Sequence, residues 1–300
     1  MPELVLPAAS VDLSRLPAPV LVPTLGLEAE RAALIDDFVS RYPDFTAIVE
    51  SDPAIKQIEA FAYRVELLRR ATDAAARGLL LAYASGAVLD QLGAYVGVVR
   101  LVVTPADPET GTPELLEADD DLRQRIALAP ASFSVAGPEE AYVFFARAAD
   151  ARVAHASAIS PAPREVIVSI LARAGDGAAT PDLIEAVAAI VNSKPVRPLT
   201  DLVTVQSAEI IDFAIDASLT LFAGPDRNLV VAAARARLDD YLARSRQLGR
   251  DLTRSAISAA LHVEGVQRIV INAPPADIVC NRTQAGHCTG IAIEVVGYDD

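Results

Sequence analysis

A run of apolar and small residues with a 3.5-residue period constrains this chain more than any other feature of its sequence. Its members follow one another in alternating steps of four and three residues: Ala54, Ile58, Phe61, Val65, Leu68, Thr72, Ala75, Leu79 and Ala82. The period lasts about four heptads and is typical of a helix that packs lengthwise against another helix. Because Asp52 is a good N-cap and Pro53 a good first helical residue, the sequence predicts one long helix that begins here.

The period leaves the partner of this predicted helix open. The stripe can pack inside the chain as core, or it can join a helical bundle formed between subunits. Glu66 and Arg70 are four residues apart and off the stripe, so we expect them on an exposed face. Our candidate interface with other chains consists of five residues of the stripe: Phe61, Val65, Leu68, Ala75 and Leu79.

The residue pattern divides the chain into four parts. Residues 1–26 contain five prolines and predict an extended arm, because each proline fixes φ and removes a backbone donor. Residues 27–150 have helical patterns, and residues 151–209 and 210–300 each combine strand-like runs with helices. The expected fold class is therefore α+β, with an N-terminal helical bundle region followed by two small α+β sandwich units.

A weak internal repeat relates the last two parts. In one copy, strand-like residues 166–172 lead through Gly175 to a helix that opens at Pro181. In the other, residues 213–222 lead through Gly224-Pro225-Asp226 into a helix, so both copies predict strand, turn, helix and return strand. Along the second strand the alternation predicts an inward apolar row: Phe213, Ile215, Ala217, Leu219 and Leu221.

The composition argues against several classes of function. A formal net charge of −14 is unfavourable for nucleic-acid binding, which needs clustered cations. Two cysteines cannot form a disulfide framework, and this favours a reducing compartment. We find no leader pattern at the N-terminus and no apolar run long enough to span a bilayer. We therefore expect a protein that is assembled in the cytosol and binds neither nucleic acid nor membrane.

Three short segments could carry chemistry, and each has a structural explanation. The cysteines and histidine at Cys280, His287 and Cys288 lack the spacing and fourth ligand of a zinc site. The acidic residues 117–121 lack the glycine of a calcium loop and suit the capping of a helix N-terminus. Residues 175–177 (Gly-Asp-Gly) lack the lysine of a phosphate loop.

Two histidines could take part in catalysis with nearby serines. His155 is close in sequence to Ser157 and Ser160, and His262 is close to Ser258. No nucleophile-elbow motif accompanies either of them, and His262 suits the wall of a core. We therefore expect no catalytic residue, metal or cofactor, and the whole pattern indicates an assembly component.

Motif-like segments occur in order along nearly the whole chain. The first to be noticed is residues 83–93, Tyr-Ala-Ser-Gly-Ala-Val-Leu-Asp-Gln-Leu-Gly, which is not diagnostic by itself. Others are residues 13–19, 100–106, 117–126, 134–138, 175–177, 196–201 with 203–205, 249–252 and 261–266. Together and in this order they resemble the baseplate protein J family of contractile phage tails.

The resemblance implies a structural wedge subunit of a baseplate rather than an enzyme. In that family two copies of the chain join one smaller wedge partner, protein I, through a helical bundle. The wedges close into a ring around the central hub and spike and contact the lysozyme-like wedge protein that initiates the sheath. The ring rearranges on host contact and releases the sheath. The implied location is the baseplate of a virion or tail-like particle such as a bacteriocin, assembled in the cytoplasm of the bacterial host.

One alternative from a different functional class stays open at this point. A soluble hydrolase-like enzyme could have its cleft between the two α+β units. Such an enzyme predicts carboxylates that converge in a pocket. No spacing in this sequence selects a pair of carboxylates for that role.

Overall fold

The computed structural model of the 300-residue chain describes residues 13, 16–23, 25–46, 48–134, 136–224 and 226–299. The fold is α+β, as expected, and the chain forms two compact units. The first comprises residues 1–100 and 118–126, and the second comprises residues 101–117 and 127–300. Within the described ranges, none of the helices combines the length and apolar content needed to cross a lipid bilayer.

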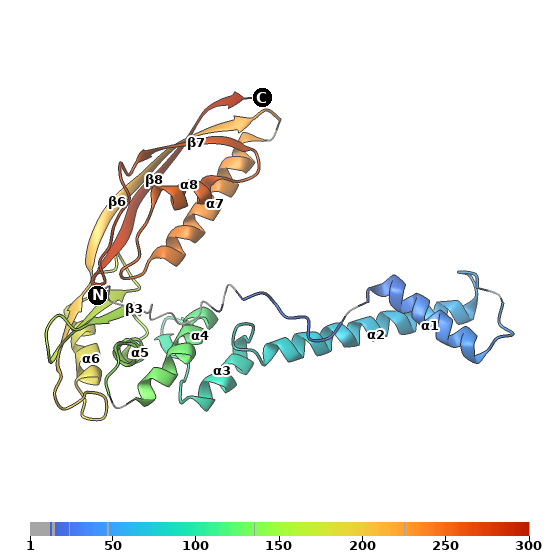
Figure 1. Ribbon diagram of the computed structural model, residues 1–300, viewed down its shortest axis with the longest axis horizontal. Helices are drawn as coiled ribbons and strands as arrows, with labels where there is room; N and C mark the ends of the chain where they lie inside the picture. The colour runs from blue at the N-terminus through green and yellow to red at the C-terminus, as the bar shows by residue number, and fades with distance from the viewer. Residues whose placement is uncertain are drawn as a thin grey trace, which may run out of the picture. The chain divides into compact units, whose positions relative to one another are not determined.

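The first unit is helical, and α2 is its longest helix (Figure 1). The unit contains α1 (Leu27–Arg41), α2 (Pro53–Gly78), α3 (Gly86–Tyr95) and most of α4 (Asp119–Leu128). α2 begins as predicted, because the side chain of Asp52 accepts the N–H of Ala54 at 2.8 Å. It ends at Gly78, so the expected helical stripe does not reach Ala82, and Leu79 is the C-cap residue.

The early end of α2 has a local cause. The N–H of Leu79 bonds to Ala76 O at 3.2 Å and that of Leu80 to Arg77 O at 2.9 Å. These three-residue spacings tighten the last turn and satisfy carbonyls that would otherwise lack partners. Glycine at position 78 also weakens the helix at this point.

The second unit begins with a small hairpin within the part of the chain for which the sequence predicted helical patterns. β1 (Val102–Thr104) and β2 (Leu115–Leu116) pair antiparallel. The carboxylate of Glu117 accepts the N–H of Leu101 at 3.1 Å, and the main-chain N–H of Glu117 donates to Leu101 O at 2.9 Å. A 3₁₀ helix (Ala129–Phe133) follows α4.

The middle sandwich packs two helices on one three-stranded sheet. Its elements are α5 (Glu139–Ala149), β3 (Val153–Ile159), β4 (Glu165–Ala172), α6 (Pro181–Val191) and β5 (Leu202–Ser207). The strand order is β3-β4-β5, with β3 antiparallel and β5 parallel to the central β4. α5 precedes the expected division at residue 151, yet its Tyr142 and Ala146 lie in this core.

The C-terminal sandwich repeats this arrangement with longer strands. Its elements are β6 (Glu209–Phe222), α7 (Arg227–Ser245), α8 (Arg254–Leu261), β7 (Val266–Ala273) and β8 (Gln284–Asp299). The strand order is β7-β6-β8, with β7 antiparallel and β8 parallel to β6. The predicted inward row is confirmed, because all five of its residues are buried: Phe213, Ile215, Ala217, Leu219 and Leu221.

The two sandwiches share the start of the predicted repeat and differ in how the chain returns. In the middle sandwich one helix, α6, reverses the chain once, so β5 runs parallel to β4. In the C-terminal sandwich two helices, α7 and α8, reverse it twice, so β7 runs antiparallel to β6. Asp226 caps α7 as predicted, whereas Pro225 of the predicted turn lies outside the described residues.

Only one residue separates the sheets of the two sandwiches. Ala208 joins β5 to β6, and its N–H donates to Ile170 O of the middle sheet at 2.8 Å. Around it a small apolar cluster draws residues from both sandwiches: Leu171, Ala208, Ile210, Leu248 and Ala285. The connection therefore contains no flexible linker.

Candidate assembly interface

One side of α2 packs inside its own unit, against α1. The buried residues of α2 are Ile55, Ile58, Ala62 and Glu66, which are spaced three or four apart and so share a face. Ion pairs join the two helices beside this face, from Arg31 Nε to Glu59 Oε1 at 3.2 Å and from Arg69 Nε to Glu30 Oε2 at 3.6 Å. α1 and α2 therefore form a packed helix pair, with a narrow apolar core between the two helices.

Glu66 lies on this inner face, contrary to our expectation. Its side chain is only 8% exposed overall, and Arg70 on the next turn donates a hydrogen bond to it. The predicted interaction between Glu66 and Arg70, four residues apart, is therefore present. Its placement was wrong because the face that α1 covers is set by Ile58 and Ala62, and Glu66 follows Ala62 by one turn.

The predicted interface stripe lies on a different side of α2 and is largely uncovered in the described chain. Phe61 is 63% exposed, Leu68 67% and Leu79 70%. Ala75 is also exposed and Val65 is half-buried. Large apolar side chains in a row of this kind are unusual on the surface of a monomer and mark interaction sites.

A second uncovered apolar region lies on another side of α2, further round the helix axis from the stripe. Tyr63 and Leu67 are exposed and four residues apart, so they share one side of α2. Taking 100° per residue, that side is well removed from both the stripe and the α1-facing side. α2 therefore has two uncovered apolar regions on different sides, and α1 covers a third side.

The proline-containing arm lies along α2 where it is described. The side chain of Asp73 accepts the N–H groups of Leu21 and Val22, each at 3.1 Å. Further along, Arg69 donates to Pro23 O at 3.3 Å and the Tyr83 hydroxyl donates to Leu16 O at 2.6 Å. The bonds from the N–H groups of Val22 and then Leu21 hold the pKa of Asp73 below its ordinary value. Pro2 and Pro7 of the expected arm lie outside the described residues.

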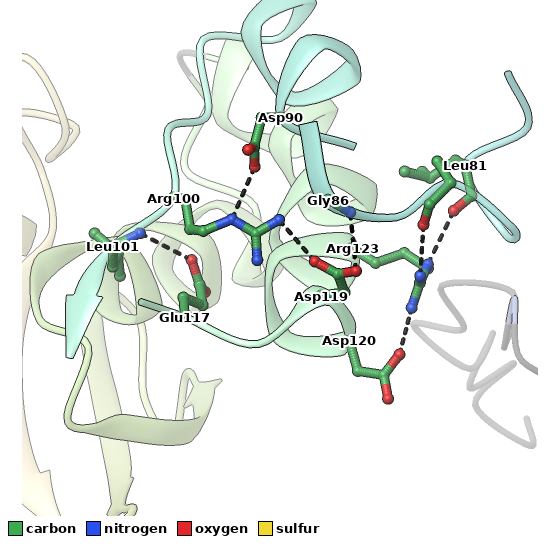
Figure 2. Close-up of polar contacts among 10 residues, drawn as sticks. Leu81, Gly86, Asp90, Arg100, Leu101, Glu117, Asp119, Asp120 and Arg123 are labelled. Atoms are coloured by element: carbon green, nitrogen blue, oxygen red, sulfur yellow. Dashed lines mark hydrogen bonds and ion pairs between the residues drawn. The ribbon is translucent and has the colours of Figure 1, made fainter. Parts of the chain in front are cut away.

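A cluster of charged residues fixes α3 and α4 beyond the end of α2 (Figure 2). Arg100 donates to Asp90 of α3 at 2.8 Å and to Asp119 at the start of α4 at 2.7 Å. The other oxygen of Asp119 accepts the N–H of Gly86, the first residue of α3, at 3.0 Å. We call Asp90, Arg100, Asp119 and Arg123 the polar clamp.

Arg123 completes the polar clamp from the next turn of α4. Its guanidinium donates to Leu81 O at 2.9 Å and to Ala84 O at 2.8 Å, and it also pairs with Asp120 (Figure 2). The carbonyls of the turn between α2 and α3 therefore find their donors on α4. Such bonds to a charged donor are stronger than those between neutral groups.

The acidic run thus caps a helix, but not in the way that the sequence suggested. Asp119 begins α4 yet caps the N-terminus of α3, where Ser85 makes no capping bond through its side chain. The N–H of Gly86 and then Arg100 hold the pKa of the Asp119 carboxyl below its ordinary value. A glycine is required nearby, because a Cβ on Gly93 would lie 2.7 Å from Val98 O.

The other candidate residues contact structural partners. Nδ1 of His155 accepts the N–H of Leu248 at 3.3 Å, whereas Ser157 donates to Arg282 O. His262 is exposed as the C-cap residue of α8 rather than part of a core wall. Among the described residues, no three His, Cys, Asp or Glu side chains are placed to hold a metal ion.

The segment 175–177 and two hollows lie in the second unit. Arg246 donates to Gly175 O at 2.7 Å, so this turn contacts the C-terminal sandwich. One hollow of about 230 Å³ contains Tyr142, whose hydroxyl donates to Asp201 at 2.8 Å, and burial followed by this bond raises the pKa of Tyr142. The other, of about 380 Å³, lies between α7 and β8. Each is lined by a single sandwich, not by both.

Comparison with known proteins decides the family. Residues 50–107 match the Baseplate J-like N-terminal domain, residues 134–207 the Baseplate J-like central domain and residues 213–294 the Baseplate J-like protein C-terminal domain. The chain is 43% identical over 299 residues to Baseplate protein J of Escherichia phage P2, covering 97% of this chain and 99% of that protein. The chain belongs to the baseplate J family.

The resemblance inferred from the motifs is therefore confirmed, and with it a structural role in a phage baseplate. Two of the motif segments, 83–93 and 117–126, contain three of the four residues of the polar clamp. Sequence reasoning missed the polar clamp, since Arg100 is separated by about ten to twenty residues from its carboxylates. The available signal was one arginine between two acidic motif segments.

Proposed function

We propose that this chain is a wedge subunit that joins other baseplate chains through the uncovered surface of α2. The observation that carries the proposal is the exposure of the stripe Phe61, Leu68 and Leu79 on a helix whose other side is already packed. Covering one large apolar side chain contributes roughly 1.5–3 kcal/mol. A partner helix along the stripe would therefore gain stability from several such side chains at once.

The extent of the apolar surface supports more than one partner helix. The stripe and the region of Tyr63 and Leu67 occupy different sides of α2, and helices pack about 8–10 Å apart. One added helix covers one side, so two added helices are needed for both. A second copy of this chain and the smaller wedge protein I are the two partners that we propose.

The larger assembly follows from this wedge role. We propose that the wedges close into a ring around the hub and spike, contact the lysozyme-like sheath-initiating protein and transmit host contact to the contracting sheath. The linker-free connection at Ala208 supports this role, because a displacement of one sandwich is passed to the other. In this proposal the chain catalyses no reaction and is assembled in the bacterial cytoplasm before it joins the tail.

The test is co-expression with the smaller wedge protein I, followed by light scattering of the purified material. We expect a complex with two copies of this chain and one of the small protein. Leu68→Glu should abolish the complex, because an unpaired charge buried in the bundle costs several kcal/mol. Ala33→Glu, which adds the same charge on the exposed side of α1, is the matched control and should leave the complex intact.

Two outcomes would contradict the proposal. One is a monodisperse monomer that ignores the small protein. The other is unfolding of the whole chain by Leu68→Glu, which would show that the stripe is internal core. Circular dichroism of the variant distinguishes loss of assembly from loss of fold.

A further inference from the structure

The outer edge of β8 is open in the part of the chain that the structure describes. β8 pairs with β6 on one side and is the last strand of the order β7-β6-β8 (Figure 1). An open edge presents unpaired N–H and C=O groups that can template pairing with another chain. Proteins usually protect such edges with short strands, lysine, proline or other devices.

The two edge strands of this sheet, β7 and β8, differ in how well they are protected against pairing with another chain. β7 has eight residues, carries the exposed Arg268 and is followed directly by Pro274 and Pro275. β8 has sixteen residues and contains no lysine, arginine or proline between Gln284 and Asp299. Two irregularities in its pairing with β6 flank a regular stretch over residues 290–295. β7 is therefore a protected edge, and the middle of β8 is not.

The hydrophobic core is also incomplete along β8. Ile291, Ile293 and Val295 pack against the core but are only partly buried. Their neighbours on the central strand, Ile215 and Leu219, are almost completely buried. Apolar surface is thus left beside the open edge, where an added strand would cover it.

The hollow between α7 and β8 adjoins this same edge. Its volume is about 380 Å³, and its lining includes Leu242 of α7 with Cys288 and Ile291 of β8. A strand added at the edge of β8 would place alternate side chains over this hollow.

We propose that two copies of this chain pair through their β8 strands, antiparallel and centred on Ile293. This inference goes beyond the wedge role of α2 and does not depend on it. In an antiparallel pair centred on residue 293, the residue numbers of opposed positions sum to 586. Ile291 therefore faces Val295 of the second copy, and Ile293 faces its own equivalent. The partly buried row becomes a continuous apolar ladder across a two-fold axis.

Charge selects this register over the next one. Glu294 faces Ala292 of the second copy when the pair is centred on Ile293. A pair centred on Glu294 would bring two carboxylates directly opposite each other, which is unfavourable. Of these two registers, the one centred on Ile293 avoids opposed carboxylates.

The same register assigns a role to an exposed aromatic residue near the end of the strand. Tyr298 is 56% exposed, and its pairing partner on β6 is Leu221, which faces the core. Its position in the register is opposite Cys288 of the second copy, beside the hollow. Tyr298 of each copy would therefore help to close the hollow of the other.

Charge variants at Ala292, an exposed position, test the pairing without disturbing the core. Ala292→Glu places like charges opposite each other in two rungs, and the Kd of self-association should rise roughly tenfold. Ala292→Lys places opposite charges there, and the Kd should fall several-fold. Both effects should shrink at high salt. Sedimentation equilibrium of the full chain measures them, and Tyr298→Ala should also weaken the association.

Val270 on the opposite edge strand supplies the matched control. It is also exposed, and Val270→Glu and Val270→Lys should leave the Kd within about twofold of the parent. Each variant is measured in the wild-type and Leu68→Glu backgrounds, so that association through α2 is separated from association through β8. If the α2 proposal fails, the difference between the wild-type and Leu68→Glu backgrounds will change. The effects of the Ala292 variants on the Kd can still be measured in both.

Three results would overturn the pairing. The first is an equal effect of Ala292→Glu and Ala292→Lys, which would exclude this register. The second is an equal response to the changes at Val270. The third is a Leu68→Glu chain that stays monomeric up to about 100 µM with an unchanged circular dichroism spectrum.

Discussion

The long helices α2 and α7 make opposite use of similar apolar patterns. On α7 the buried residues Val230, Ala234 and Leu238 are spaced by four and pack on the sheet of the same sandwich. On α2 the most prominent apolar residues, Phe61 and Leu68, are exposed, and the face that packs on α1 is a different one. Periodicity thus shows that a helix has an apolar surface, but it does not show whether the same chain covers that surface.

The two regions also differ in what holds their elements together. The sandwiches have continuous apolar cores, whereas α3 and α4 of the first unit combine buried residues such as Leu89 and Leu122 with the polar clamp around Arg100. Burial of apolar area and charged hydrogen bonds respond differently to mutation and to pH.

Leu238→Ala should destabilise the C-terminal sandwich far more than Leu68→Ala destabilises the first unit. Leu238 is fully buried, and its truncation should cost about 3 kcal/mol. Leu68→Ala should change the free energy of unfolding by less than about 0.5 kcal/mol. Urea denaturation of the two variants of the isolated chain gives both values. Equal losses in the free energy of unfolding would show that α2 is covered by its own chain. They would contradict the difference between α2 and α7.

Acidification should weaken the contact of the middle sandwich with the C-terminal sandwich. Burial, reinforced by the nearby charge of Arg147, lowers the pKa of His155 to about 4. The unfolded chain therefore binds a proton near pH 6.5 and the folded chain only near 4, so stability falls as the pH drops through this window. The free energy of unfolding should be constant above this window, and it should fall by about 3 kcal/mol in total across it.

Thermal denaturation between pH 4 and pH 8 tests this prediction. His155→Gln should remove most of the pH dependence in this window, because the titrating group is gone. A profile for the variant that keeps the parental slope would assign the effect to other groups.

Arg100→Met should loosen the polar clamp and leave the sandwiches unaffected. Asp90 and Asp119 would lose a charged donor at a site where the Arg100 side chain is 13% exposed, and the expected cost is about 2 kcal/mol. Hydrogen exchange should rise in α3 and not in β6. Arg64→Met, which removes an exposed arginine of α2, is the control. Faster exchange throughout both units would contradict a local role.

Asp73→Asn should have the smallest effect, confined to the arm. Asparagine keeps one acceptor oxygen and removes the charge that the N–H groups of Leu21 and Val22 contact. Amide exchange at these two residues should become several-fold faster with no change in the melting temperature. The pKa of Asp73 is lowered in the folded chain, so the same release should occur in the parent as the pH falls below the ordinary range of an aspartate. An arm unaffected by either change would be held by its other contacts.

Much of the fold could be predicted from local patterns. The alternation over residues 213–222 fixed which side of β6 faces the core, since the side chains of a strand alternate by geometry. Pro181 marked the start of α6 because proline suits the first helical position. The end of α2 could not be found in this way, as the apolar period continues to Ala82 beyond the last helical turn.

The polar clamp and the direction of the return strands required the tertiary structure. Asp119 looks like a cap for its own helix, and only folding shows that its carboxylate caps α3. The repeat predicted a return strand in both sandwiches, but the number of helices before it decides whether that strand is parallel or antiparallel. A sequence pattern contains no information about distances between segments far apart in the chain.

The α+β class, the family and the presence of a long helix with an apolar stripe could all be recognised from the sequence, because propensity, periodicity and ordered motifs are local properties. Only the tertiary structure decided that α1 covers Ile58 and Ala62 while Phe61 and Leu68 stay uncovered. It also decided that β8 ends the sheet with an open edge. The physical reason is that burial depends on which other elements arrive at a surface, and this depends on the whole path of the chain.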